Sequence, residues 1–171
     1  MKIRQRIAEE LSDAFPGLQT ETPGEGRLLV LAGKDSVIAV LGYLKRRGYN
    51  HLALISCVDW MEEGEFELVY ILSAYPRGEG GAAAREELSI LVKTRISRKR
   101  PDAATAIPVF ANAEPLEREI HELFGIVFAG HPRLTPLFLE REYPIPPFRK
   151  DFDTRQYVKD FFDKIPEVQQ E

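Results

Sequence analysis

The residues best suited to acid–base or metal chemistry are three histidines, His51, His121 and His131. His121 opens the segment His-Glu-Leu-Phe-Gly, which begins like the H-E-x-x-H motif of zinc proteases, but Gly125 stands where the second histidine must be. His121 and His131 lie on either side of a predicted helix end, so no fixed helical spacing brings their rings onto one metal ion. We therefore expect no metal site. An alternative function keeps His121 or His131 as a general acid or base beside a carboxylate, in a small enzyme that works alone.

Other patterns that could hold a cofactor or a nucleophile are incomplete. The lone cysteine, Cys57, excludes an internal disulfide, and an iron-sulfur cluster normally takes four thiolates. The glycine-rich segment 78–81 is not followed by the Lys-Ser or Lys-Thr of a phosphate-binding loop, so we interpret it as a flexible connection. We find no Ser-His-Asp or Cys-His arrangement at an identifiable nucleophile turn. We expect the chain to bind no cofactor and to carry no catalytic residue.

Composition and charge narrow the class of partner. The 171 residues are 44% hydrophobic and 29% charged, as in a soluble globular domain, and the formal net charge is −4. This charge argues against nucleic acid, although an RNA-binding module built on Arg95 to Arg100, with salt-sensitive binding to single strands, is a second alternative. No apolar run approaches the roughly 20 residues that span a bilayer, and the charged segment 1–15 is unlike a signal peptide. These features predict a cytosolic chain.

The strongest helix pattern covers residues 113–124. Asn112 can cap its start, Pro115 fits the first turn, and Gly125 can take the left-handed conformation that ends a helix. A spacing of four pairs Glu114 with Arg118, and Arg118 with a later glutamate. The helical spacing places four apolar residues on one stripe: Leu116, Ile120, Leu123 and Phe124. It places four charged or polar residues off this stripe: Glu117, Arg118, His121 and Glu122.

The segments before this helix predict an α+β fold. Apolar spacing and stop signals indicate helices over residues 3–15 and 37–47, the second capped by Asp35 or Ser36. Runs of apolar and β-branched residues indicate strands over 27–32, 51–58, 66–72 and 87–94. We expect the second and third strands to pair antiparallel and the fourth to have one solvated face. The predicted fold is a mixed, largely antiparallel sheet of four or more strands, with helices packed on one face.

The chain after residue 128 differs in character. Its prolines exclude a long helix or a central strand, so we predict an α+β domain over 1–128 and an extended, partner-binding tail over 129–171. Residues 154–165 have the apolar spacing of a short amphipathic helix, carried by Tyr157, Phe161 and Ile165. This helix either docks on another subunit or folds back on its own domain.

Several separated blocks of this region occur in an order that points to one family. They are Glu117-Arg118-Glu119-Ile120, Leu123-Phe124-Gly125-Ile126, Phe128, Gly130-His131-Pro132 and Arg149-Lys150-Asp151-Phe152. Together they resemble the signature of the 30-kDa subunit family of respiratory complex I, which includes counterparts in membrane-bound energy-converting hydrogenases. The detailed match covers about 40 residues, and the order of helices and strands before it is compatible with the family.

The resemblance implies a non-catalytic, hydrophilic subunit in the peripheral arm of a membrane-associated oxidoreductase, on the cytoplasmic side of the membrane. Its implied partners are a large subunit that carries the quinone or nickel-iron site and a small iron-sulfur subunit. These partners, and not this chain, would hold the iron-sulfur clusters. The implied partner-binding or tail-anchoring residues are Glu117, Arg118, Glu119, His131, Arg149, Lys150, Asp151 and Phe152.

Three departures from the usual complex I pattern favour a hydrogenase-type or other related assembly. His121-Glu122 stands where an aromatic residue and Asp are usual, and Arg133 stands where Asp is usual. The segment 146–151 reads Pro-Pro-Phe-Arg-Lys-Asp instead of the commoner Pro-Leu-Arg-Lys-Asp. The electron donor and acceptor stay open.

Overall fold

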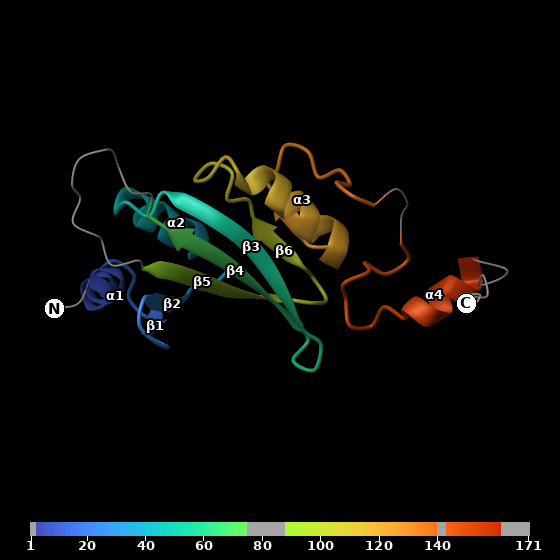
Figure 1. Ribbon diagram of the computed structural model, residues 1–171, viewed down its shortest axis with the longest axis horizontal. Helices are drawn as coiled ribbons and strands as arrows, with labels where there is room; N and C mark the ends of the chain where they lie inside the picture. The colour runs from blue at the N-terminus through green and yellow to red at the C-terminus, as the bar shows by residue number, and fades with distance from the viewer. Residues whose placement is uncertain (1–2, 75–87, 140–142, 162–171) are drawn as a thin grey trace, which may run out of the picture.

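The computed structural model describes residues 3–74, 88–139 and 143–161, which form four helices and seven strands (Figure 1). The helices are α1 (Ile3–Ala14), α2 (Val37–Arg46), α3 (Ala113–Phe124) and α4 (Thr154–Phe161). The strands are β1 (Gln19–Glu21), β2 (Arg27–Leu31), β3 (His51–Trp60), β4 (Glu65–Ser73), β5 (Ser89–Ser97), β6 (Asp102–Ala104) and β7 (Val127–Ala129). The predicted α+β class is confirmed. Among the described residues, no helix has both the length and the apolar character needed to cross a bilayer.

Five of the strands form one mixed sheet in the order β1-β2-β5-β4-β3. The predicted antiparallel pairing of β3 with β4 is confirmed, and β5 is the other neighbour of β4, also antiparallel. β2 and β5 pair in parallel, while β1 pairs antiparallel with β2. The two remaining strands, β6 and β7, form a short parallel pair that the sequence pattern does not predict as a sheet.

One face of the five-stranded sheet carries the hydrophobic core. The register places Leu28, Ile90 and Leu72 side by side across β2, β5 and β4, and all three are buried. Helix α2, predicted from its apolar spacing, buries one stripe that consists of Val37, Val40, Leu41 and Leu44. Burying such a side chain fully contributes about 1.5–3 kcal/mol relative to leaving it exposed, so this stripe holds α2 on the sheet.

The C-terminal end of α3 agrees with the prediction, and its N-terminal end differs from it. Gly125 follows the helix in the left-handed conformation, with φ of 76°, and its N–H donates to the carbonyl of His121. Asn112 stands at the N-cap position but makes no side-chain cap hydrogen bond. Its amide donates instead to the carbonyl of Leu52 at 2.8 Å. Asn112 therefore joins the start of α3 to β3, a long-range role that local capping rules do not predict.

The chain after β7 contains no helix or strand over residues 130–139 and 143–153, and α4 then lies apart from the sheet (Figure 1). α4 covers the first part of the helix predicted over 154–165, and residues 162–165 lie outside the described residues. The division into a domain over 1–128 and a tail over 129–171 stays a prediction.

Candidate functional site

Glu117 lies in the interior of the fold, and its side chain does not face a charged side of α3 as the sequence pattern suggested. Its relative exposure is 0%, and the buried residues of the helix are Ala113, Glu117 and Ile120. The hydroxyl of Thr105 and the backbone N–H of Ala106 each donate to its carboxylate at 2.6 Å. Burial raises the pKa of Glu117, and the hydrogen bonds from Thr105 and Ala106 partly oppose that rise. The carboxylate thus ties α3 to the loop that follows β6.

Two other charged residues of α3, Arg118 and Glu122, hold the segment 135–139. The guanidinium of Arg118 donates to the carbonyls of Thr135 and Pro136 at 3.0 and 2.9 Å. The carboxylate of Glu122 accepts hydrogen bonds from the backbone N–H groups of residues 137, 138 and 139. Burial raises the pKa of Glu122, but these backbone hydrogen bonds and Arg118 outweigh burial and leave the pKa lowered. One side of α3 therefore anchors a stretch of irregular chain.

Two of the histidines make hydrogen bonds with backbone groups. The N–H of Arg133 donates to Nδ1 of His131, so Nε2 carries the proton and donates to the carbonyl of Glu114 at 3.1 Å. Nδ1 of His121 lies 2.8 Å from the carbonyl of Ile126, which requires a proton on Nδ1. These contacts give both rings a structural role. Within the described residues, no group of three or more His, Cys, Asp and Glu side chains is arranged to hold a metal ion.

A second anchor, which we call the Asp59 clasp, joins the sheet to residues 149–151. Arg98 donates to both oxygens of Asp59 at 2.9 and 3.2 Å and to Asp151 at 2.6 Å. The backbone N–H of Lys150 donates to Asp59 at 2.8 Å, and Arg149 donates to the carbonyl of Arg98 at 3.2 Å. The hydrogen bond from Arg98 is the main cause of the lowered pKa of Asp151. The clasp therefore holds the Arg-Lys-Asp block of the sequence against the end of β3.

Aromatic rings reinforce the clasp. Phe124 stacks edge-to-face between Phe66 of the core and Phe148, with ring centroids 6.1 and 5.9 Å apart. The guanidinium of Arg149 lies over the ring of Phe66 at 5.2 Å. The N–H of Phe148 also donates to the carbonyl of Leu123. The clasp and the end of α3 thus hold the same short segment from two sides.

The basic segment considered for RNA binding is largely engaged in ion pairs within the chain. Arg95 pairs with Glu65 and Glu67, each at 3.1 Å, and Arg98 belongs to the clasp. Arg100 lies 3.7 Å from Asp102 and is exposed. These pairs neutralise the positive charge that binding to a nucleic-acid backbone would need.

Five of the eight residues predicted to bind a partner belong to the two anchors. Arg118 and His131 belong to the anchors of α3, and Arg149, Lys150 and Asp151 belong to the clasp, where the Lys150 side chain is exposed. Of the other three, Glu117 is buried, and Glu119 and Phe152 are half-buried. Their contact with a partner stays a prediction. The sequence pattern did not single out Asp59 or Thr105. A charged residue at the end of the apolar strand β3 was the available signal for Asp59.

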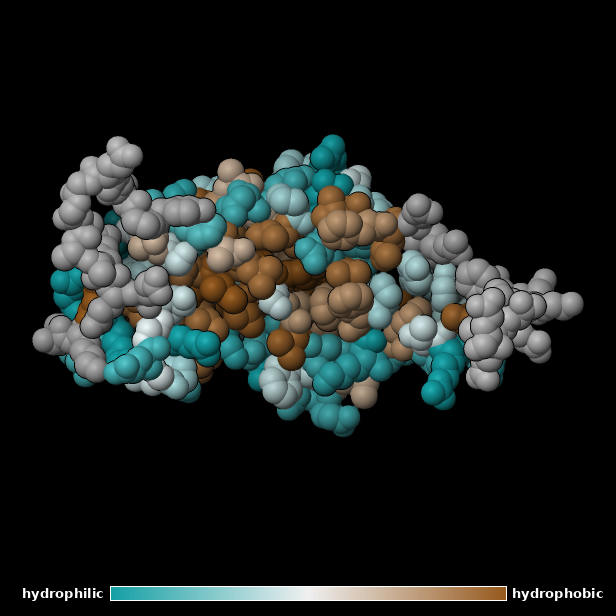
Figure 2. Space-filling model, in the orientation of Figure 1, coloured by the Kyte–Doolittle hydropathy of each residue, from teal (hydrophilic) through white to brown (hydrophobic). Residues whose placement is uncertain are grey.

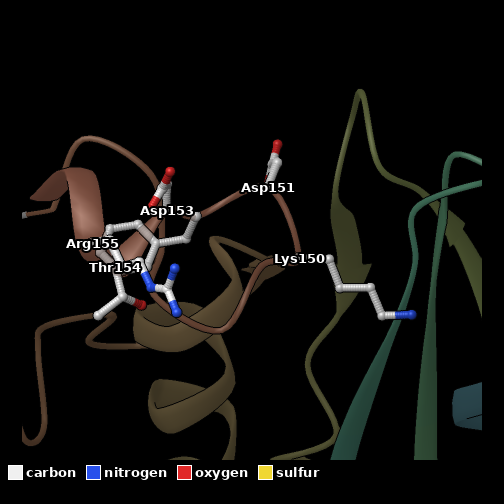
Figure 3. Close-up of a pocket in the computed structure, with 6 residues that line it drawn as sticks. Lys150, Asp151, Asp153, Thr154 and Arg155 are labelled. Atoms are coloured by element: carbon white, nitrogen blue, oxygen red, sulfur yellow. The ribbon is translucent and has the colours of Figure 1, made fainter.

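An open depression of about 460 Å³ lies beside the clasp, lined by residues 150–155 (Figure 3). The Lys150 side chain points away from Asp153, Thr154 and Arg155, toward the strands (Figure 3). Asp153 caps α4 by accepting a hydrogen bond from the N–H of Gln156 at 3.0 Å. These residues form the turn into α4 and do not converge on a common point.

Comparison with known proteins gives a family match over most of the chain. The model of the family described as "Respiratory-chain NADH dehydrogenase, 30 Kd subunit" matches residues 30–158. A subunit of the F(420)H(2) dehydrogenase of Methanosarcina mazei is 32% identical over 86% of this chain and 90% of its own length. A subunit of the NADH-quinone oxidoreductase of Moorella thermoacetica is 32% identical over 84% of this chain and 91% of its own length.

A solved structure shows the same fold over nearly the whole chain. One chain of the membrane-bound sulfane sulfur reductase, an archaeal respiratory membrane complex, matches with a TM-score of 0.82 and 27% identity. That match covers 98% of this chain and 95% of the other. A trypsin-resistant fragment (1–134) of Nqo5 matches with a TM-score of 0.64 and 29% identity, over 77% of this chain and all of the fragment.

Proposed function

Because the chain belongs to the family of the 30-kDa subunit of respiratory-chain NADH dehydrogenase, we propose that it is a non-catalytic peripheral subunit of a complex-I-like, membrane-associated oxidoreductase. Three relatives support this assignment, and their names differ in the chemistry they carry: F420H2, NADH with quinone, and sulfane sulfur. The named electron donor or acceptor thus varies among the relatives, while a subunit of this type occurs in each.

The single observation that carries the proposal is the use of charge around α3. The side chains of Arg118 and Glu122 form hydrogen bonds with backbone groups of the segment 135–139. In the same way, the carboxylate of Asp59 accepts a hydrogen bond from the backbone N–H of Lys150. Side chains that stabilise irregular backbone in this way build a surface, and they are not poised for acid–base chemistry. Phe138, in the anchored segment, and Phe148, beside the clasp, are 66% and 60% exposed, so each offers an apolar side chain to a partner.

The proposed partners are a large subunit that carries a quinone or nickel-iron site and a small iron-sulfur subunit. Electrons would pass through the iron-sulfur clusters of these neighbours, on the cytoplasmic side of the membrane, and this chain would hold no cofactor. The half-buried side chain of Glu119 makes no hydrogen bond or ion pair with the residues that the structure describes, so it joins the exposed Lys150 side chain as a candidate contact to a partner.

Purification of the native complex through a tag on this chain tests the proposal. We expect membrane extracts to yield the large subunit and the iron-sulfur subunit, with iron-sulfur signals by electron paramagnetic resonance in the complex and none in the isolated chain. Assays of the complex with hydrogen, NADH, F420H2 and quinone analogues then identify the donor and acceptor. Turnover by the isolated chain, or recovery of the chain without partners, would contradict the proposal.

Replacing Arg118 by Ala tests the role of the anchored segment. The change removes the donors to Thr135 and Pro136 but leaves the sheet and its core untouched. We expect the isolated variant to fold and to recover less of the large subunit than the wild type. Arg46→Ala, on α2, is the matched control and should recover as much as the wild type.

A further inference from the structure

The second face of the five-stranded sheet is apolar where an outward face should be polar. Antiparallel sheets with one solvated face alternate apolar and polar residues, and the sequence pattern predicted such a face on β5. The register instead places Leu29 and Ile71 on either side of Leu91, and Leu54 beside Ile71. None of these side chains belongs to the core cluster under the helices.

This open face is continuous across the middle of the molecule, as Figure 2 shows over β3, β4 and β5. Leu54 and Val58 on β3 are 41% and 37% exposed. The register assigns to the same face the half-buried Leu29, Leu31, Trp60, Ile71 and Leu91 and the buried Val69. A contiguous apolar surface of this kind marks a site of interaction.

The charged residues at one end of the open face neutralise one another. Glu67 accepts hydrogen bonds from Lys93 at 2.9 Å and from Arg95 at 3.1 Å, and Arg95 also reaches Glu65 at 3.1 Å. The guanidinium of Arg95 lies 4.7 Å from the centre of the Trp60 ring. Two acidic and two basic groups leave no net charge for an anionic lipid or a nucleic acid to bind. The charge pattern therefore complements an uncharged, apolar surface.

We propose that the open face docks against the apolar side of amphipathic helices of a larger neighbouring subunit, giving a helix–sheet–helix arrangement. Sheets bury an apolar face against helices or a second sheet, and parallel strands are the ones that helices cover on both faces of a sheet. The strands β2 and β5 of this face form such a parallel pair. The inference rests on the proposed function, because it names a second surface through which the same chain joins its complex. It is separate from the segment anchored by α3, which lies on the helix side of the sheet.

The first test is recovery of the native complex through a tagged chain that carries Leu54→Glu and Val58→Glu. Both positions are exposed in the isolated chain, so the variant should fold, as circular dichroism can verify. Burying unpaired carboxylates at the interface costs more than the roughly 1.4 kcal/mol of a tenfold change, so we expect recovery of the large subunit to fall by about tenfold or more. The matched control is Val127→Glu, which changes another exposed strand residue, 48% exposed, and should recover the complex fully.

The second test measures access to the face without disturbing it. Leu54→Cys and Val127→Cys are labelled with a thiol reagent in the isolated chain and in the purified complex. Burial, with smaller contributions from Asp59 and Glu67, raises the pKa of Cys57 to about 12, so the native thiol stays protonated and does not compete. We expect assembly to protect position 54 and to leave position 127 as reactive as before.

The outcomes separate this inference from the proposed function. If the wild-type chain recovers no complex, the proposed function fails. If it does, equal recovery by the double glutamate variant, or equal labelling of position 54 in both states, overturns the docking of this face. A dimer of the isolated chain that the double glutamate variant abolishes would assign the face to a second copy and overturn the inference as well.

Discussion

The guanidinium of Arg98, which is 16% exposed, donates to both carboxylate oxygens of the buried Asp59, at 2.9 and 3.2 Å. The two residues lie at the ends of β3 and β5, and through Lys150 and Asp151 they fix the direction of the C-terminal segment. A bidentate pair of this kind has a defined geometry and holds its partners in one orientation.

Replacing Asp59 by Asn should weaken this junction. The amide keeps the size of the carboxylate but loses its charge and one of its acceptor oxygens, while Arg98 retains its contact with Asp151. We expect the free energy of unfolding to fall by about 1.5–3 kcal/mol, the range for hydrogen bonds to charged groups. Urea denaturation measures the change. Asp13→Asn, at an exposed position of α1, is the control and should stay within about 0.5 kcal/mol of the wild type.

Replacing Glu117 by Gln should change how stability depends on pH. The folded-state pKa of Glu117 is raised, first by burial, so its contribution to stability is present below the unfolded pKa and is lost as the pH rises through the folded pKa. Gln does not titrate. We therefore expect the variant to gain stability relative to the wild type as the pH rises above about 4.5, the ordinary pKa of glutamate, measured as the difference in unfolding free energy at each pH. A constant difference, or a trend of opposite sign, would contradict the raised pKa.

Two glycine-to-alanine changes should have effects of opposite sign. Gly125 has φ of +76°, and an added Cβ would lie 3.0 Å from Cγ of Pro146, so Gly125→Ala should cost about 1–2 kcal/mol. Gly42 lies inside α2, where an added Cβ meets Nη1 of Arg46 at an ordinary 3.5 Å. Gly42→Ala should therefore add about 0.5–1 kcal/mol. Thermal unfolding of both variants under one set of conditions checks the prediction, which fails if the two changes shift the midpoint in the same direction.

Features encoded by short periodic patterns could be predicted from the sequence. The four apolar residues of α2 lie on one helical stripe, and Gly125 combines a helix end with the one residue type that favours a left-handed conformation. The antiparallel pairing of β3 and β4 follows from two apolar runs joined by a short acidic turn. In each case the signal lies within a few neighbouring residues.

Features that depend on distant segments could not be predicted in this way. Glu117 is charged, so the helical pattern assigned it away from the core, but the loop at Thr105 and Ala106 supplies the hydrogen bonds that make its burial tolerable. The short strands β6 and β7 come before and after α3 in the sequence and pair in parallel. Each has only three residues, which is too short for a recognisable strand pattern. Asn112 was expected to cap α3 because Asn is a preferred N-cap residue, but its amide donates to the carbonyl of Leu52, which is far away in sequence.

The parallel pairing of β2 with β5 also sets an order for synthesis. Leu28 lies beside Ile90, and α2, β3 and β4 are all made between these two residues. A nascent chain that has left the ribosome only as far as β4 lacks the strand that joins its two halves, since β5 is hydrogen-bonded to β2 on one side and β4 on the other. The five-stranded sheet therefore cannot be completed during translation until Ser89–Ser97 has emerged from the ribosome, even if α1 has formed earlier.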